Sequence, residues 1–539
     1  MPIRPRLRPL VRSLPLLCFL LIPSAKSQSP DASTPGRLIL VLPFENRSGD
    51  GSLNWIGDSF PDTLNQRLNS AGFLTITRDD RQFAFDHLGL PVDFKPTRAT
   101  TLRIAQTLDA DYIIVGNYSV SSGRITVQAR VLSVKSLHLS APLEDSSELP
   151  RLFDIENAIA WKVAREIDPK FPVAQQTFLA ASGGVKLTAF ENYIRGTDAP
   201  SSIERIKRLQ LAVAEASDYS AALLALGKAQ YAARQYDAAA GTLGKVPTTD
   251  RLALEASFYL GLARFNTNKY ADAQKAFEFV ATRLPLPEVV NNEAVAISRQ
   301  GRDAVPLFQQ VITADPNDAD YHYNLAVALI HRGDPGAAMP ELDAALKLRP
   351  TDSEALDLKP RLAAAQHLTG TPLTSAITAG GFDPLERIRR SYSEASFRQA
   401  TFQMDQVRAL RLTALPAAEQ AAQYTKVGND YLNQGLLPEA EREFLAAIAA
   451  DSTSALAHAG LAQVRERSGD ESEARTEAQT SIKLRPNATA YIVLARLDLR
   501  NNDLAASAAD VGQALRLEPE NGPALGMKQQ LQYRNQSVQ

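Results

Sequence analysis

The side chains that most often perform catalysis are few and scattered in this sequence. Six histidines occur, and none stands at the spacing of a metal site from a glutamate or another histidine, as in His-Glu-x-x-His. A Gly-x-Ser-x-Gly elbow is absent, and so is the Ser-x-x-Lys set of penicillin-binding enzymes. We therefore predict no catalytic residue, no metal ligand and no cofactor, and we expect a protein that is not an enzyme.

Two short polar stretches could instead bind an ion. Residues 315–320 read Asp-Pro-Asn-Asp-Ala-Asp, but they lack the glycine and the final glutamate of a calcium-binding EF-hand loop. Residues 46–52 lie between an expected strand and an expected helix, as phosphate-binding loops do, but the Gly-Lys-Ser/Thr ending of a P-loop is missing. We interpret the first stretch as a junction between repeats and the second as a polar turn that caps a helix.

The second half of the chain repeats with a period of about thirty-four residues. Pro316 and Pro350 are 34 positions apart, and Pro486 and Pro519 are 33 apart. A small residue stands 12 positions before each proline, where it would let two helices approach closely, and the proline would end the second helix. One helix pair cannot bury its apolar face, so several pairs must stack into an all-α solenoid with an inner groove. Such a groove indicates binding rather than catalysis.

The repeat also has a characteristic set of residues. Its clearest copy contains Leu260, Gly261, Tyr270, Ala273, Phe277 and Pro285. This pattern resembles the tetratricopeptide repeat (TPR), a helix–turn–helix unit, and the resemblance implies a right-handed superhelix of about eight units. A glycine-rich loop interrupts the pattern, and it either bends one superhelix or separates two stacks. The expected parts are a first TPR block at residues 187–366, the loop at 367–383, a helical connector at 384–412, and a second TPR block with a closing helix at 420–535.

Three polar side chains are candidates for binding a partner in the groove. In tetratricopeptide domains that hold a peptide carboxylate, asparagines and lysines project from the first helices of successive units. Asn292 and Asn324 stand at roughly matching positions of neighbouring units, and Lys228 lies on an earlier first helix. The resemblance therefore implies partner-binding roles for Lys228, Asn292 and Asn324. The Lys-x-x-x-Arg pair of a carboxylate clamp is not recognisable, and asparagine is also common on helix surfaces, so both interpretations stay open.

The amino-terminal region, residues 37–172, follows a different pattern. Residues 38–44 form an almost continuous apolar run, which is typical of a strand buried on both faces, and residues 112–116 form a second run. Alternating strands and helices with a late hairpin predict a mixed α/β domain. The other expected elements are helices at 54–68, 100–108 and 152–167, a strand at 73–78, and a hairpin at 117–136.

This α/β region also resembles a known module. The segments that carry the resemblance are LILVLPFENRSGD (38–50), DADYIIVGNYSV (109–120), RITVQARVLS (124–133) and LFDIENAIAWKVA (152–164). They are similar to the TolB-amino-terminal-like (FlgO/TolB-like) domain. The resemblance implies an interaction module of the bacterial cell envelope, often followed by tetratricopeptide repeats, and it carries no catalytic residues.

Residues 1–27 are predicted to be a secretory signal peptide. Four arginines precede a short apolar run at residues 14–22, and small residues at Ala25 and Ser27 favour cleavage after Ser27. An uncleaved amino-terminal anchor is the alternative, although the run is short for a membrane span. Cleavage would remove Cys18, the only cysteine, together with five cations, so the formal charge would move from −2 to −7 (−2 − 5). We expect an exported, mildly acidic protein of the periplasm or cell envelope that does not bind nucleic acid.

These features together predict a non-enzymatic scaffold or adaptor that binds proteins or peptide segments in its TPR grooves. The alternative hypothesis is a ligand-sensing subunit, in which the α/β domain binds a small molecule or an envelope polymer and the repeats transmit the signal. Trp55 and Trp161 both lie in that domain, so their fluorescence would respond to such a ligand. A third hypothesis is a structural part of an outer-membrane or secretion machine.

Overall fold

The computed structural model describes residues 38–90, 97–180, 185–365, 373–378, 381–390, 407–408 and 410–538. The predicted signal peptide lies outside these residues, as do residues 391–406 of the predicted connector. Within the described part of the chain, none of the helices is long and apolar enough to span a membrane.

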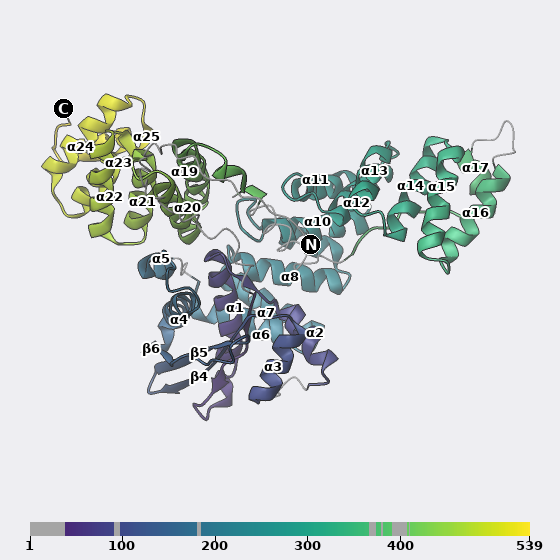
Figure 1. The fold of residues 1–539 in the computed structure, drawn as a ribbon, viewed down its shortest axis with the longest axis horizontal. Coiled ribbons are helices and arrows are strands. Elements are labelled where there is room, and N and C mark those ends of the chain that lie inside the picture. Colours follow the sequence, from purple (N-terminus) through teal and green to yellow (C-terminus); the bar gives the residue numbers. More distant parts are fainter. Residues whose placement is uncertain are drawn as a thin grey trace, which may run out of the picture. The chain divides into compact units, whose positions relative to one another are not determined.

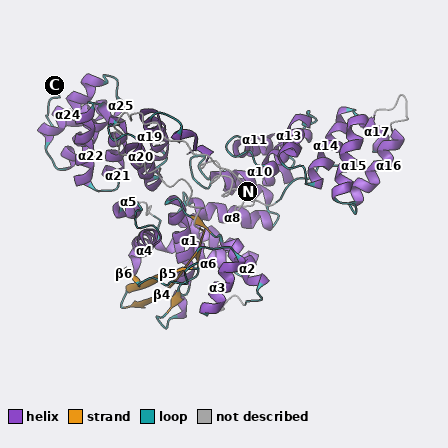
Figure 2. Cartoon of the chain, viewed as in Figure 1, coloured by secondary structure: helices purple, strands orange, loops and turns teal. Residues whose placement is uncertain are grey.

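A mixed sheet forms the centre of the amino-terminal domain (Figures 1 and 2). The strand order is β3-β1-β4-β5-β6, and β2 also pairs with β4. Strand β1 runs parallel to β3 and β4, whereas β5 is antiparallel to both β4 and β6. The strands are β1 (Leu38–Val41), β2 (Glu45–Asn46), β3 (Leu74–Thr75), β4 (Tyr112–Ser121), β5 (Arg124–Ser133) and β6 (Leu143–Glu148).

Helices cover both faces of this sheet. On one face, Ile39 and Val41 belong to the core that α1 and α4 complete, and on the other, Leu40 and Leu42 pack with α2 and α3. Successive side chains of a strand point to opposite faces, so β1 is buried on both sides, as its apolar run predicts. The helices are α1 (Trp55–Ser70), α2 (Arg78–His87), α3 (Arg98–Thr107) and α4 (Leu152–Ile167).

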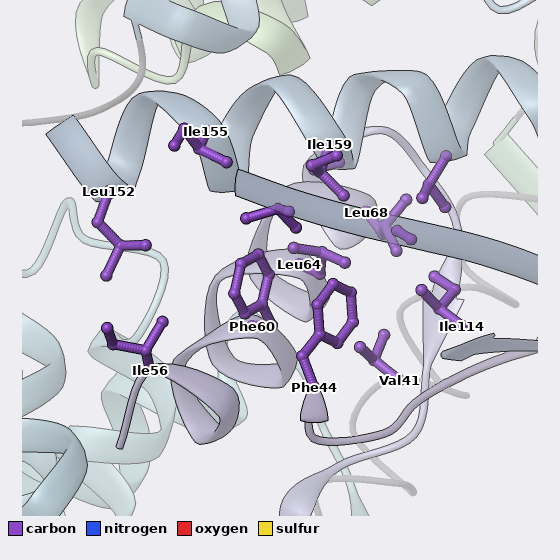
Figure 3. Packing of buried hydrophobic residues seen from close by; sticks show 14 of the residues in the cluster. Val41, Phe44, Ile56, Phe60, Leu64, Leu68, Ile114, Leu152, Ile155 and Ile159 are labelled. Carbon is purple, nitrogen blue, oxygen red and sulfur yellow. The ribbon is translucent and has the colours of Figure 1, made fainter. Parts of the chain in front are cut away.

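Aromatic and aliphatic side chains fill the layer between the sheet and α1 (Figure 3). The rings of Phe44 and Phe60 are stacked with their centroids 4.1 Å apart. Leu64 of α1 and Ile159 of α4 lie in the same cluster and are fully buried. Burying a side chain of this kind contributes about 1.5–3 kcal/mol, so this layer supplies much of the stability of the domain.

Helix α2 and strand β6 are among the elements of the α/β domain that were not predicted. Helix α2 is mostly polar and buries only Arg81 and Ala84, so its apolar face is too narrow to produce a helical period. Strand β6 reads Leu-Glu-Asp-Ser-Ser-Glu, and it alternates between half-buried and exposed residues at the end of the strand order. Its pairing with β5 is what makes it a strand, and propensity alone does not indicate it.

Paired helices follow the α/β domain, and the apolar core continues from the domain into the first of them. The first predicted block starts at residue 187, where α6 begins, and the second at residue 420, three residues after the start of α19. After α5 (Gln175–Ala180), they are α6 (Leu187–Asp198), α7 (Ser202–Glu215), α8 (Ser220–Ala232), α9 (Tyr236–Leu243), α10 (Ala253–Asn266), α11 (Tyr270–Ala281), α12 (Pro287–Ser298), α13 (Val305–Ala314), α14 (Ala319–Arg332), α15 (Pro335–Leu348), α16 (Ser353–Ala365), α17 (Leu373–Ile377), α19 (Ala417–Asn433), α20 (Leu437–Ala450), α21 (Ala455–Arg467), α22 (Glu471–Leu484), α23 (Ala488–Arg500), α24 (Leu504–Leu517) and α25 (Gly522–Tyr533).

The small residues of the repeat pattern lie where the two helices of a unit touch. A Cβ atom on Gly261 would come within 2.6 Å of the Phe277 ring, and one on Gly428 within 2.8 Å of the Phe444 ring. These distances are shorter than van der Waals contact, so only glycine allows the helices this close together. The predicted packing reason for the repeat pattern is confirmed.

Residues 367–390 differ from the prediction in two places. Residues 373–377 form helix α17 inside the predicted loop. The predicted helical connector begins at residue 384, but residues 382–390 form neither helix nor strand. We call them the extended segment, because the side chains of Arg387 and Arg389 both reach Asp320, whereas Glu386 lies on the other side, beside Arg299. The main-chain groups of Arg387 and Arg389 are bonded to side chains of the preceding repeats, so these groups gain less from forming a helix.

Candidate functional site

The extended segment, residues 382–390, lies against the first helices of three successive units. These are α12, α14 and α16, which follow one another along the stack (Figure 1). First helices line the inner groove of a stack of helix pairs. The segment therefore lies along the inner face of the first predicted TPR block, and we interpret this face as the predicted groove, occupied in the way a bound peptide would occupy it.

Two asparagines hold the main chain of this segment. The Asn324 side-chain amide donates to the Arg387 carbonyl at 2.8 Å, and the Asn324 Oδ1 atom accepts from the Arg387 N–H at 2.6 Å. Asn292 makes the same pair of bonds with Arg389, at 2.8 and 2.7 Å. Each asparagine thus satisfies both main-chain polar groups of one residue, which stabilises an extended chain whatever its side chains are.

A third asparagine completes the amide network. Asn291 donates to the Arg387 carbonyl at 3.1 Å, and its Oδ1 atom accepts from the Asn324 amide at 2.8 Å. All three asparagines are fully buried. Asn291 was missed from the sequence, although it stands 33 positions before Asn324, a separation close to the repeat period. Asn291 and Asn292 are adjacent, and measuring the separation of each from Asn324 against the repeat period would have identified Asn291 as well.

An acidic cluster holds the Arg387 guanidinium. Its Nη1 atom lies 2.7 Å from Asp320 and 2.6 Å from Asp352, and its Nη2 atom lies 2.8 Å from Glu354. The guanidinium also stacks over the Tyr323 ring at 3.8 Å, a cation–π contact. Hydrogen bonding by Arg387 and the charges of nearby arginines hold the pKa of Asp352 below its usual value, against the opposing effect of burial.

Arg389, two residues after Arg387, contacts the same acidic cluster and extends it to Asp318. Its guanidinium pairs with Asp318 and lies 3.1 Å from Asp320. The Tyr321 ring lies 4.9 Å below it. Burial would raise the pKa of Asp320, but hydrogen bonds and charges from the surrounding arginines outweigh it and lower that pKa. Asp320 and Asp352 are therefore ionised and paired with cations at neutral pH.

Glu386 points into a separate, buried site. Its side chain is 1% exposed, accepts a hydrogen bond from Ser298, and lies 3.4 Å from Arg299 and 3.3 Å from His331. Burial alone would raise its pKa, but the hydrogen bonds from His331 and Ser298 and the Arg299 charge lower it below the usual value. This pocket accepts a carboxylate, whereas the acidic cluster accepts arginines.

Apolar contacts support the polar ones. Ile388 packs against the cores of two neighbouring units, and Phe382 packs against one of them while Arg361 stacks over its ring at 4.6 Å. The first TPR block thus contacts four features of the segment: its main chain, its two arginines, the Glu386 carboxylate and its apolar side chains.

The three predicted site residues fall into two places. Asn292 and Asn324 come together at the segment, whereas Lys228 forms an ion pair with Glu255 at 2.7 Å and lies over the Tyr259 ring at 5.3 Å. Residues 315–320, considered as a calcium loop, contribute Asp318 and Asp320 to the arginine contacts instead. Among the described residues, no group of three or more potential ligands could hold a metal ion.

The other considered stretch, residues 46–52, forms a local turn. The Asn46 amide donates to the Asp50 carbonyl and to Asn54, both at 2.8 Å. Asp50 accepts from the Ser52 N–H at 2.9 Å and thereby caps a short 3-10 helix, Gly51–Leu53. These contacts use the polar groups of the turn internally, as the interpretation of a capping turn predicts.

Comparison with known families identifies the repeat. Residues 297–362 match one model of the tetratricopeptide repeat, and residues 426–489 match a second. The helical part of this chain contains tetratricopeptide repeats. The first match covers much of α14 and α16, whose residues hold the extended segment, so the occupied groove is a TPR groove. No curated protein sequence matches the chain.

Several solved structures are similar to parts of the chain. MamA from Desulfovibrio magneticus RS-1 is 19% identical over 32% of this chain and 100% of that chain, with a TM-score of 0.29. YrrB, described as a TPR protein with an unusual peptide-binding site, is 16% identical over 37% of this chain and 98% of that chain, with a TM-score of 0.29. The LpoB C-terminal domain from Escherichia coli is 26% identical over 22% of this chain and 87% of that chain, with a TM-score of 0.19.

Proposed function

We propose that this protein is an exported, non-enzymatic adaptor of the cell envelope whose first TPR block binds an extended segment of a partner protein. The observation that carries the proposal is the double hydrogen bonding of Asn292 and Asn324 to the main chain of residues 389 and 387. Such bonds recognise an extended backbone, which any protein can present from a loop or a terminus.

The proposed location in the envelope is supported by two features of the sequence. Residues 1–27 have the arginines, the apolar run and the small residues of a cleavable signal peptide. The α/β domain resembles the TolB-amino-terminal-like module, and the mixed sheet covered by helices is compatible with that proposal. Fractionation of the native host and mass spectrometry of the purified protein test this part: a mature protein that begins at Gln28 is expected, and a cytoplasmic chain with residues 1–27 intact would contradict it.

Photocrosslinking tests the groove in the cell. A photoreactive phenylalanine analogue at Glu354, whose side chain is 61% exposed beside Arg387, should crosslink to a partner segment that mass spectrometry can map. The matched control is Lys347, an exposed residue of the second helix α15. Partner crosslinks at Glu354 that disappear in the N292A/N324A variant support the proposal. Equal crosslinking at both positions, or none at Glu354, would reject the groove as the binding site.

A further inference from the structure

The bound segment has an order of side chains that matches the groove. In an extended chain, alternate side chains point to opposite sides, so Arg387 and Arg389 share one side while Glu386 and Ile388 share the other. The arginines face the acidic cluster of α14 and α16, and Glu386 and Ile388 face the buried side of the groove. Each of the four positions is therefore paired with a site of matching chemistry.

We propose that the groove selects partner segments with the pattern Glu-Arg-aliphatic-Arg, and that residues 386–389 are a built-in competitor which such a segment displaces. This inference rests on the proposed function, because it assumes that the groove also binds segments of other proteins. The expected partner is a protein with this pattern in an exposed, extended stretch.

Charge gives the groove its selectivity. Without residues 386–389, Asp318, Asp320, Asp352 and Glu354 would lie close together. Arg349 would remain beside them, 2.6 Å from Asp320 and 3.6 Å from Asp352. Like charges in a partly buried site repel one another, so the empty groove favours a segment that brings two guanidinium groups. Asp or Glu at either arginine position would be rejected for the same reason.

Residues 382–390 form neither helix nor strand, so displacing them breaks no helix or sheet hydrogen bonds. The segment's polar contacts are side-chain hydrogen bonds and ion pairs, Ile388 adds apolar contacts, and Arg387 and Arg389 keep 19% and 28% of their side chains exposed. A partner segment with the same four residues would make the same contacts. The chain's own segment is tethered, so its effective concentration at the groove is high. It therefore competes with the partner segment and lowers the apparent affinity of the groove for that segment.

Fluorescence anisotropy with a labelled peptide tests this directly. The probe is the octapeptide DPLERIRR, which copies residues 383–390, and the proteins are the full wild-type chain and its R387A/R389A variant. The variant should release its own segment and bind the probe at least about tenfold more tightly than the wild type does. A control peptide with alanine at both pattern arginines should bind the variant more than about tenfold more weakly than the probe.

The outcomes separate this inference from the proposed function. The inference is supported if the R387A/R389A variant binds the probe more tightly than the wild type does and binds the alanine peptide much more weakly than the probe. If the alanine peptide binds as well as the probe, the groove recognises only the main chain of a segment. The proposed Glu-Arg-aliphatic-Arg pattern is then wrong, whereas the proposed function stands. Equal affinity of wild type and variant would refute the built-in competitor. If neither chain binds the probe, the inference fails, and photocrosslinking at Glu354 judges the proposed function independently.

A second measurement keeps the test valid if the variant folds poorly. In the wild-type chain, excess probe should speed hydrogen exchange at the Arg387 and Arg389 amides, because displacement removes their bonds to Asn324 and Asn292. The alanine peptide should leave the exchange unchanged. Unchanged exchange with both peptides at saturating concentration would overturn displacement.

Discussion

At the scale of single residues, the groove depends on buried amides. Asn292 and Asn324 could be predicted because they stand at similar positions in successive repeats, a relation that the sequence contains directly. Arg387 and Arg389 could not, because their importance comes from Asp320 and Asp352, which are far away in sequence and are brought close by the stacking of the units. For the same reason, residues 315–320, which contain Asp318 and Asp320, were interpreted only as a junction between repeats.

The first prediction concerns the stability that the two asparagines supply. N292A and N324A should each lower the free energy of unfolding by about 1–3 kcal/mol, because each leaves main-chain groups of Arg389 or Arg387 without partners. Urea unfolding followed by circular dichroism measures the change. N433A, at an exposed position near the end of α19, is the control and should change stability by less than about 0.5 kcal/mol. Equal effects of all three substitutions would show that the asparagine bonds contribute nothing.

The second prediction concerns a buried carboxyl group in the α/β domain. Burial raises the pKa of Glu156 to about 8, although Ser59 and Thr63 donate hydrogen bonds to it at 2.5 and 2.7 Å. The folded protein then holds a proton that the unfolded chain loses near its ordinary pKa of 4.5. The contribution of Glu156 to stability should therefore be greatest below that value, fall by up to about 1.4 kcal/mol per pH unit as the pH rises, and level off above about 8.

The variant E156Q removes this titration while keeping the shape of the side chain. Its stability should change less than that of the wild type between pH 5 and pH 8. Denaturant unfolding monitored by tryptophan fluorescence reports on this domain, because both tryptophans, Trp55 and Trp161, lie in it. The same pH dependence in E156Q and wild type would show that Glu156 is already ionised in the folded protein.

At the scale of elements, the sequence predicts structure where packing repeats and fails where a distant contact decides. Helix α4 has the predicted bounds, 152–167, because its apolar face alone indicates a helix. The residues from 384 onward have arginines, a glutamate and Ile388 at spacings that also fit a helix, yet residues 382–390 are extended. Bonds to Asn292 and Asn324, which a local pattern cannot contain, determine that conformation.

The third prediction tests how closely the helices of the second block pack. A Cβ atom on Gly460 of α21 would lie 2.2 Å from the Phe444 ring, so G460A should destabilise the protein by about 1–3 kcal/mol. The matched control is Gly526 in α25, where an added Cβ meets nothing within 4 Å. G526A should stabilise by about 0.5–1 kcal/mol, since alanine favours a helix more than glycine does. Thermal unfolding of both variants provides the comparison, and a neutral G460A would contradict the packing account.

At the scale of the whole molecule, the α/β domain and the first repeat share one core. Trp55 of α1 meets the Phe190 ring of α6 with the centroids 6.2 Å apart, and the Tyr193 hydroxyl donates to Asp62 at 2.9 Å. Resemblance of each part to a known module predicted the order of the domains, but neither pattern contains information about this junction. Because the cores are continuous, we expect the α/β domain and the first repeat to unfold together.

Asn292 and Asn324 hold residues 386–389 in the first TPR groove. Hydrogen–deuterium exchange at single-residue resolution tests it most directly, because these residues have no secondary structure to protect their amides. In the wild-type chain, the Arg387 and Arg389 amides should exchange as slowly as those of the neighbouring helices, and in N292A/N324A they should exchange at the rate of an unstructured peptide. Fast exchange of both amides in the wild-type chain would contradict the account.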